Sequence, residues 1–214
     1  MPQTDSPTRA APKDLSAKSV KGGKTLQRIL RSAAIAFARK GYAETTLSDI
    51  AQEAGTQPGS LYYHFESREH IVRELIRKAT EEVHAIVAEV LDAMDQQASY
   101  RERITAGVRS HLAIYHSGNP FIAAYTRIID EVPPDMRNQT LSVRKSYADL
   151  WQDLIVGAQQ AGELRADLDP TVARLLLFGS VFWTHAWYRD GGRLSLEAIA
   201  DQLLSTFFDG AATS

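Results

Sequence analysis

Apolar residues recur at three- and four-residue spacing along most of the chain, which is the period of an α-helix that buries one face. Glycines, prolines and Asn-Pro or Asp-Pro pairs separate these stretches. No stretch alternates polar and apolar residues for long enough to predict a β-strand. The pattern therefore predicts an all-α fold of about nine helices, at residues 24–40, 46–54, 58–65, 67–94, 100–117, 120–130, 135–161, 170–188 and 195–208.

Two short predicted helices joined by a glycine form the most distinctive local pattern. Thr46 and Asp49 have the spacing of a capping box at the start of the first helix, and Gly55 follows its last turn. The second helix begins at Pro58, because proline suits the first helical turn, and continues with Gly59. Two short helices in this arrangement predict a helix-turn-helix unit.

The sequence of the second short helix, QPGSLYYHF at residues 57–65, suits contact with duplex DNA. Gly59 and Ser60 have little side-chain bulk, so the start of the helix can approach another surface closely. Leu61 and Phe65 are four residues apart and should pack inward. The two tyrosines then remain on other faces, where a ring can meet a thymine methyl group and a hydroxyl can meet a phosphate. The alternative is that both tyrosines are half-buried packing residues.

The charge distribution indicates a polyanionic partner for the first part of the chain. The 214 residues carry a net charge of −2, yet residues 1–80 hold 13 Lys/Arg and 8 Asp/Glu, a net charge of +5. The remainder holds 11 and 18, a net charge of −7. Residues 1–22, rich in Pro, Ser, Ala and Lys, are predicted to be a disordered basic arm that either touches phosphates or only solubilises the protein.

Several classes of protein are excluded by composition. No apolar run approaches the roughly 20 residues that cross a bilayer, and the N-terminus lacks the apolar segment of a secretory signal. Cysteine is absent, which excludes disulfides and thiolate metal sites. The six histidines show no metal-binding spacing, and neither a G-x-S-x-G motif nor a phosphate loop occurs. We therefore predict a cytoplasmic protein without catalytic residues, metal or cofactor, and keep an enzyme that uses an aromatic cavity only as a less favoured alternative.

The stretch KGYAETTLSDIAQEAGTQPGSLYYHFESREHIVRELI resembles the N-terminal signature of the TetR family of transcriptional regulators, without a gap from about Thr25 to Ile76. That family is all-helical, dimeric and ligand-responsive. The resemblance implies a DNA-binding domain at residues 23–68 and a ligand-binding and dimerisation domain at residues 69–214. It also implies which residues contact DNA: Thr46, Ser48, Gln57, Pro58, Gly59, Ser60, Tyr62, Tyr63 and His64, with Arg68 on a phosphate at the start of the fourth helix.

Gln57 departs from the family pattern, in which many members have serine or another small cap at this position. Glutamine can bind adenine through two hydrogen bonds but caps a helix poorly. Gln57 is therefore expected either to contact a base or merely to precede the helix.

The C-terminal part carries rings and polar groups at helical spacing, which predicts a mostly apolar cavity with a few convergent polar groups. His111 and Tyr115 share one helix face, and Arg144, Tyr147 and Trp151 follow similar steps. The predicted effector-binding residues are His111, Tyr115, Phe121, Tyr125, Arg127, Arg144, Tyr147, Trp151, Phe178, Phe182 and Trp183. The alternatives are an ordinary core for the rings, and a solvated face or a salt bridge to a nearby carboxylate for the arginines.

The stretch DLDPTVARLLLFGSVFWTHAWYRDGGRLSLEAIADQLLSTFFDG resembles the end of a TetR branch that includes KstR-like and fatty-acid-responsive regulators, several of which sense coenzyme A thioesters. The resemblance rests on the turn Trp187-Tyr188-Arg189. It implies an acyl chain among the aromatic residues, with Arg127 or Arg144 meeting the phosphates of an acyl-CoA effector.

A regulator that senses cationic or aromatic drugs and controls efflux is the alternative. Such a site needs carboxylates or stacked rings around the cation. Glu89, Asp92, Asp130 and Glu131 are the acidic residues that would supply the charge.

The last two predicted helices carry more apolar residues than packing within one subunit requires. In the TetR family the corresponding helices pair in a homodimer. The predicted interface residues are Leu175, Gly179, Trp187, Leu196, Ile199, Leu203 and Phe207. A dimer carries two DNA-binding units, so the double-stranded operator should be roughly palindromic, with half-sites about 34–36 Å apart or a multiple of that. Ligand binding is expected to release a repressor from DNA through the helix at 67–94, which starts beside DNA and ends in the ligand-binding domain.

Overall fold

The computed structural model of the chain describes residues 15–210, with side chains from residue 23 onward. All regular secondary structure in this range is helical, which confirms the all-α prediction. The helices are α1 (Leu15–Glu44), α2 (Leu47–Glu53), α3 (Pro58–Tyr62), α4 (Arg68–Asp92), α5 (Tyr100–Tyr115), α6 (Pro120–Ile128), α7 (Pro134–Gln139), α8 (Leu141–Gln160), α9 (Pro170–Trp187) and α10 (Leu196–Asp209). No helix within 15–210 combines the length and apolarity needed to cross a bilayer.

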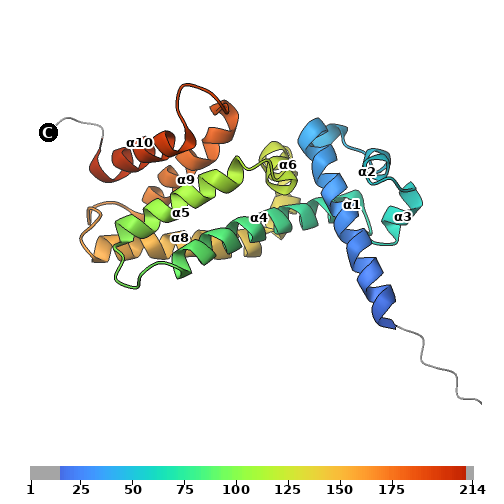
Figure 1. Ribbon diagram of the computed structural model, residues 1–214, viewed down its shortest axis with the longest axis horizontal. Coiled ribbons are helices and arrows are strands. Elements are labelled where there is room, and N and C mark those ends of the chain that lie inside the picture. Colours follow the sequence, from blue (N-terminus) through green and yellow to red (C-terminus); the bar gives the residue numbers. More distant parts are fainter. Residues whose placement is uncertain (1–14, 211–214) are drawn as a thin grey trace, which may run out of the picture.

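The helices form an elongated molecule with two parts (Figure 1). We call α1–α3 the head and α5–α10 the body. The long helix α4 runs from the head along the body, and α6 lies against α1 where the two parts meet. The α2–α3 unit lies at the end of the head that is farthest from the body.

Among the boundaries that differ from the sequence prediction, two change how the chain is divided into helices. The helix predicted at 135–161 is two helices, because the backbone leaves helical geometry at Thr140 (φ −99°, ψ 5°), whose hydroxyl donates to the carbonyl of Arg137 at 2.8 Å. Helix α1 begins at Leu15, so residues 15–22 are helical instead of belonging to a disordered arm. Once a helix is nucleated, each added residue gains a hydrogen bond, which favours this extension. Residues 1–14 of the predicted arm lie outside the described residues.

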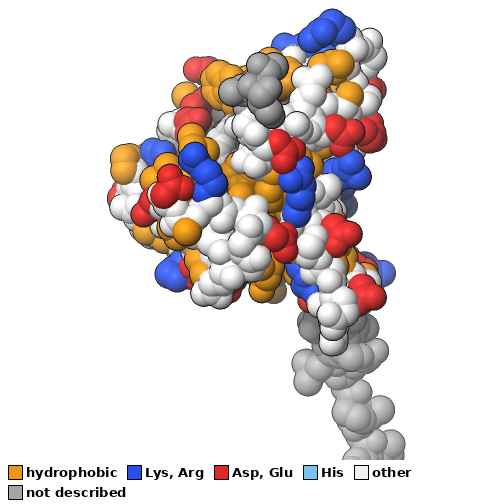
Figure 2. Space-filling model, turned by 90° about the vertical axis from the view of Figure 1, so that its left-hand side faces the viewer, with side chains coloured by type: hydrophobic (Ala, Val, Ile, Leu, Met, Phe, Trp, Pro, Cys, Tyr) orange, Lys and Arg blue, Asp and Glu red, His pale blue; other side chains and the backbone are white. Residues whose placement is uncertain are grey.

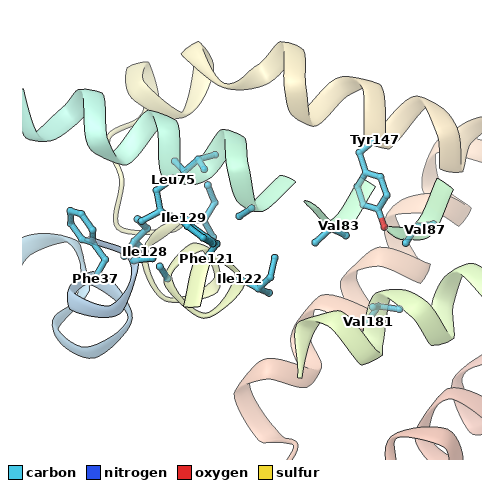
Figure 3. Close-up of a cluster of buried hydrophobic side chains, with 14 of the residues drawn as sticks. Phe37, Leu75, Val83, Val87, Phe121, Ile122, Ile128, Ile129, Tyr147 and Val181 are labelled. Atoms are coloured by element: carbon cyan, nitrogen blue, oxygen red, sulfur yellow. The ribbon is translucent and has the colours of Figure 1, made fainter. Parts of the chain in front are cut away.

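A continuous apolar core joins the head to the body. Phe37 of α1, Leu75 of α4 and Ile128 of α6 are fully buried and lie together at the meeting of the three helices (Figure 3). Burying such a side chain contributes about 1.5–3 kcal/mol. The position of the head therefore depends on its packing against α4 and against α6 of the body.

Helices α5 and α8 approach closely because each has a glycine that faces an aromatic ring of the other. A Cβ atom added to Gly107 of α5 would lie 2.8 Å from the Trp151 ring on α8. A Cβ atom on Gly157 of α8 would lie 2.2 Å from the Tyr100 ring on α5. The two reciprocal contacts fix α5 and α8 relative to each other, and both helices contribute to the cavity of the body described below.

Candidate functional site

The start of α2 is fixed by a network around its N-cap. Thr46 Oγ1 accepts a hydrogen bond from the Asp49 N–H at 3.2 Å, and Asp49 Oδ2 accepts one from the Thr46 N–H at 2.9 Å. This confirms the predicted capping box. The Lys40 ammonium, 2.7 Å from Asp49, and the Thr46 donors hold the pKa of the Asp49 carboxyl well below its usual value. The carboxylate therefore stays ionised and keeps α2 anchored to α1.

Helix α3 has one buried face and one exposed face. Leu61 and the nearby Phe65 are buried, as their spacing predicts. Tyr62 and Tyr63 are 61% and 86% exposed, so the alternative in which both rings are packing residues is wrong. Two adjacent rings are thus available to a partner of the head.

The fold of the head gives no reason for a glycine at position 59. A Cβ atom there would meet no atom of the described residues within 4 Å, and Gly59 does not have a positive φ. Glycine in a helix costs roughly 0.5–1 kcal/mol relative to alanine. Close approach of another molecule to the start of α3 would explain the glycine, because any larger side chain would obstruct it.

Most of the predicted DNA-contacting residues are exposed. The eight exposed ones are Thr46, Ser48, Gln57, Pro58, Gly59, Ser60, Tyr62 and Tyr63. His64 is half-buried and its ring lies edge-on to Tyr63, 5.0 Å between centroids. The Gln57 side chain caps nothing among the described residues, so its amide remains available to a partner.

Arg68 differs from the other predicted DNA contacts, because its guanidinium binds within the protein. Nε donates to the Thr45 carbonyl at 2.7 Å and Nη2 donates to the Tyr42 carbonyl. The guanidinium carbon also lies 4.2 Å from the centroid of the Tyr42 ring. Arg68 thus ties the start of α4 to the segment before α2, and its contact with a phosphate stays a prediction. A basic residue after an N-cap does not reveal whether its partner is a phosphate or a distant carbonyl.

The body contains a cavity of about 730 Å³, which we call the effector cavity, lined by residues of α4 to α9 and by the two residues just after α6. Its aromatic wall is made of interlocking rings: His111 lies 4.4 Å from Tyr115 and 5.6 Å from Phe178, measured between centroids. The predicted effector-binding residues that line it are His111, Tyr115, Tyr125, Arg144, Tyr147, Phe178 and Phe182.

The polar groups on the aromatic wall, the His111 imidazole and the Tyr147 hydroxyl, are uncharged. His111 Nδ1 lies 2.6 Å from the Tyr147 hydroxyl, and burial lowers the pKa of His111 to about 3. Burial also raises the pKa of Tyr147, so its hydroxyl keeps its proton. His111 Nε2 and Trp151 Nε1 have no hydrogen-bond partner among the described residues. The histidine is therefore neutral at physiological pH.

Four predicted effector-binding residues lie outside the lining of the effector cavity. Phe121 belongs to the core beside α4, and Trp151 packs behind the cavity wall. Arg127 forms an ion pair with Glu131, the salt-bridge alternative, and Trp183 is 63% exposed beside α10. Helical spacing shows which residues share a face, but not which neighbour that face meets, so spacing alone could not separate these four residues from the lining.

The charged side chains at the effector cavity are mostly basic. Four basic residues and one acidic residue line it: Arg137, Arg144, Lys145, Arg174 and Asp130. Lys145 pairs with Asp149 at 2.6 Å, whereas Arg137 and Arg144 form no ion pair within residues 15–210. Three of the four cations, Arg137, Lys145 and Arg174, were not predicted, because the polar side of an isolated helix resembles a solvated face until its neighbour is known.

A second hollow, of about 970 Å³, lies along α9 and α10, and we call it the α9–α10 groove. Leu176, Trp183 and Trp187 line it and are 65%, 63% and 49% exposed. Figure 2 views the end of the body away from the head and shows hydrophobic side chains in the hollowed middle of that face, with acidic and basic side chains around them. The predicted dimer residues that line the groove are Gly179, Trp187, Ile199, Leu203 and Phe207.

The remaining two predicted dimer residues differ. Leu175 lines the effector cavity, and Leu196 lines neither hollow. Helix α9 thus lines both the effector cavity and the α9–α10 groove, and Gly179 contributes to each.

Family descriptions match both halves of the chain. Residues 29–75 match the bacterial regulatory proteins of the tetR family, and residues 97–211 match the tetracyclin repressor-like C-terminal domain. The chain belongs to the TetR family. It is a DNA-binding transcriptional regulator of that family and not an enzyme.

Named proteins resemble most of the chain. The HTH-type transcriptional repressor KstR2 of Rhodococcus jostii (strain RHA1) is 29% identical over 187 residues, which cover 86% of this chain and 90% of the relative. The structure of AibR in complex with isovaleryl coenzyme A and operator DNA matches with a TM-score of 0.76 and 24% identity, over 86% of this chain and 98% of that one. FadR from Bacillus subtilis in complex with stearoyl-CoA matches with a TM-score of 0.76 and 20% identity, over 87% and 99%. The two structural likenesses establish the TetR fold of both head and body.

Proposed function

We propose that this TetR-family repressor binds a roughly palindromic operator as a homodimer and releases it when an acyl-CoA thioester enters the effector cavity. The observation that carries the proposal is the composition of that cavity. Aromatic rings line its interior, and the charged residues of the lining are four basic side chains and one acidic side chain. An acyl-CoA has complementary parts, since an apolar chain is joined to a polyanionic phosphate end that arginines bind well. The volume of about 730 Å³ is also typical of small-molecule sites, which span roughly 300–1,000 Å³.

Relatives support this class of effector. AibR and FadR, which share the fold, are described in complex with isovaleryl coenzyme A and stearoyl-CoA. AibR is described with operator DNA as well. These two acyl groups differ greatly in length, so they support the thioester class without selecting one acyl group for this chain.

The charge of the lining favours an anionic effector over a cationic drug. Of the four acidic residues that would bind a cation, Asp130 alone lies in the lining among residues 15–210. Glu131 instead accepts a hydrogen bond from the Tyr42 N–H. A cation in the cavity would therefore face more basic than acidic groups.

The exposed surfaces of head and body support the DNA-binding and dimeric parts of the proposal. The bare start of α3 beside exposed Tyr62 and Tyr63 suits insertion into a groove of DNA. The apolar α9–α10 groove suits burial against a second copy. Thr80 and Val83 of α4 line the effector cavity while Arg68 of the same helix contacts the head. A ligand that prefers one position of α4 would shift the population of heads able to bind DNA, and about 10⁴-fold preference would reverse a 99:1 ratio.

The test uses an operator selected from random duplex DNA. Fluorescence anisotropy of the labelled operator is measured with butyryl-, octanoyl- and palmitoyl-CoA, with coenzyme A, with the matching free acids and with a quaternary ammonium dye. We expect at least one thioester to weaken operator binding about tenfold or more, and the free acids and coenzyme A to have little effect. Release by the dye and by none of the thioesters would refute the proposal.

A charge-removing variant links the effect to the effector cavity. Arg144→Gln should weaken thioester binding by roughly 10- to 100-fold, because it removes a charge-assisted contact to phosphate. Arg193→Gln, which removes the same charge from an exposed position outside the lining of both hollows, is the control and should bind the thioester as the wild type does.

A further inference from the structure

Two elements that line the effector cavity carry side chains that bind the same residue of the head. Ile129 and Asp130, just after α6, line the cavity, and the next residue is Glu131. Glu131 Oε2 accepts a hydrogen bond from the Tyr42 N–H at 2.7 Å. Helix α4 also lines the cavity, and its first residue, Arg68, donates to the Tyr42 carbonyl. The end of α6 and helix α4, both of which line the cavity, therefore bind the backbone N–H and the backbone carbonyl of Tyr42.

A glycine at position 41 allows the backbone before α2 to lie close to the end of α6. Gly41 has φ +81°, a conformation that favours glycine. A Cβ atom at this position would lie 2.8 Å from Arg127 Nη2 and 3.0 Å from Glu131 Oε2. Arg127 precedes Glu131 by one helical turn and forms an ion pair with it. Glycine at position 41 thus serves both the backbone turn and the close contact with the end of α6.

The segment held in this way leads directly into α2. Arg68 Nε donates to the Thr45 carbonyl at 2.7 Å, and the Thr45 hydroxyl donates to the Gly41 carbonyl at 2.7 Å. The next residue, Thr46, is the N-cap of α2. A shift of residues 41–45 must therefore displace the start of α2 and the α3 helix that packs on it.

We propose that Tyr42 is the joint through which the effector cavity controls the head, with Glu131 and Arg68 as positioning residues on its N–H and its carbonyl. This inference rests on the proposed function, because it assumes that a ligand in the effector cavity alters operator binding. Neither side chain lines the cavity, and both are occupied within the protein. Their role is to set where the head sits when the end of α6 or the start of α4 moves.

The experiment measures the factor by which a saturating acyl-CoA raises the operator Kd, using the most effective thioester of the C4, C8 and C16 series. In Glu131→Ala we expect this factor to fall at least about fivefold toward 1, since couplings of 5- to 150-fold are typical of such systems. The thioester Kd without DNA should stay within about twofold of wild type, because removing a group outside the cavity costs no ligand contact. Glu131→Gln retains an oxygen for the Tyr42 N–H but loses the Arg127 ion pair, so it should restore part of the factor.

Glu163→Ala is the matched control. Glu163 also accepts backbone hydrogen bonds, from the Tyr100 N–H at 3.1 Å and the Arg101 N–H at 2.6 Å, but these lie within the body. It should therefore keep the wild-type factor, and thermal unfolding of every variant verifies folding. A wild-type factor in Glu131→Ala would overturn the role of the joint alone. If no thioester alters operator binding by the wild-type protein, the proposed function fails first, and the joint fails with it.

Discussion

Gly59 and Gly41 illustrate two different reasons for a glycine in the head. Position 41 is crowded by Arg127 and Glu131 and has a positive φ, whereas position 59 is open and helical. Gly59→Ala should therefore stabilise the protein by about 0.5–1 kcal/mol, and Gly59→Leu should leave it folded. We expect Gly59→Leu to weaken operator binding at least about tenfold, because the side chain fills the space that a groove of DNA must occupy. Chemical unfolding and operator anisotropy measure both effects, and a Leu variant with wild-type affinity would contradict the placement of α3 on DNA.

His111 makes a prediction about pH. Its pKa is about 3 in the folded protein and about 6.5 when unfolded, so only the unfolded chain takes up a proton between these values. Stability from the neutral imidazole is thus complete above pH 6.5 and is lost progressively as the pH falls toward 3. Between pH 7 and pH 5 the free energy of unfolding should fall by roughly 2 kcal/mol less in His111→Gln than in wild type. Equal losses in urea unfolding would mean that the native histidine is accessible to protons.

Residue roles could be predicted from the sequence where their partners are close in the chain. Thr46 and Ser67 cap α2 and α4 through residues three positions ahead, so their roles follow from spacing alone. The hydrogen bonds of Arg68 within the protein did not follow from spacing, because its acceptors, Tyr42 and Thr45, precede it by more than 20 residues. The exposure of Tyr63 followed from periodicity, since Leu61 and Phe65 already occupied the buried face.

At the scale of elements, the contact between α5 and α8 depends on two glycine and aromatic pairs. Gly157→Ala places a methyl group against the Tyr100 ring and should destabilise the protein by about 1–3 kcal/mol. The sign is informative, because the same change in an open helix stabilises. Gly59→Ala, where the added Cβ meets open space, is the matched control for unfolding measurements. Tyr100→Ala combined with Gly157→Ala should cost less than the sum of the single changes if the pair is in contact.

The helices themselves were largely predictable, because each buries an apolar face whose period appears in the sequence. The exception is instructive: residues 135–161 keep helical periodicity across Thr140, yet its hydroxyl bond to Arg137 and its backbone break the helix there. The lining of the effector cavity was predictable only in part. Arg137, Lys145 and Arg174 converge from three different helices, and no single helix pattern contains that information.

At the scale of the whole molecule, the basic first part and the acidic remainder correspond to a head and a body with different tasks. Helix α3, with its exposed Tyr62 and Tyr63, lies at one end of the molecule, and helices α9 and α10, which line the groove, lie toward the other (Figure 1). If the groove joins two bodies, it sets the distance between two heads, and the effector cavity shares α9 with it. Effector binding and dimer geometry are then coupled through one helix as well as through the joint at Tyr42.

Leu176→Arg tests whether the groove joins two copies, because Leu176 is 65% exposed and a buried unpaired charge would oppose association. Sedimentation should show a monomer for this variant and a dimer for wild type. The affinity for a full palindromic operator should fall by about 10²–10⁴-fold, since two linked heads bind with an avidity that single heads lack. Affinity for a half-site should stay unchanged, which separates loss of pairing from damage to the head. Leu141→Arg, a similarly exposed leucine that does not line the groove, should remain dimeric. A dimeric Leu176→Arg protein with full operator affinity would place the interface elsewhere on the body.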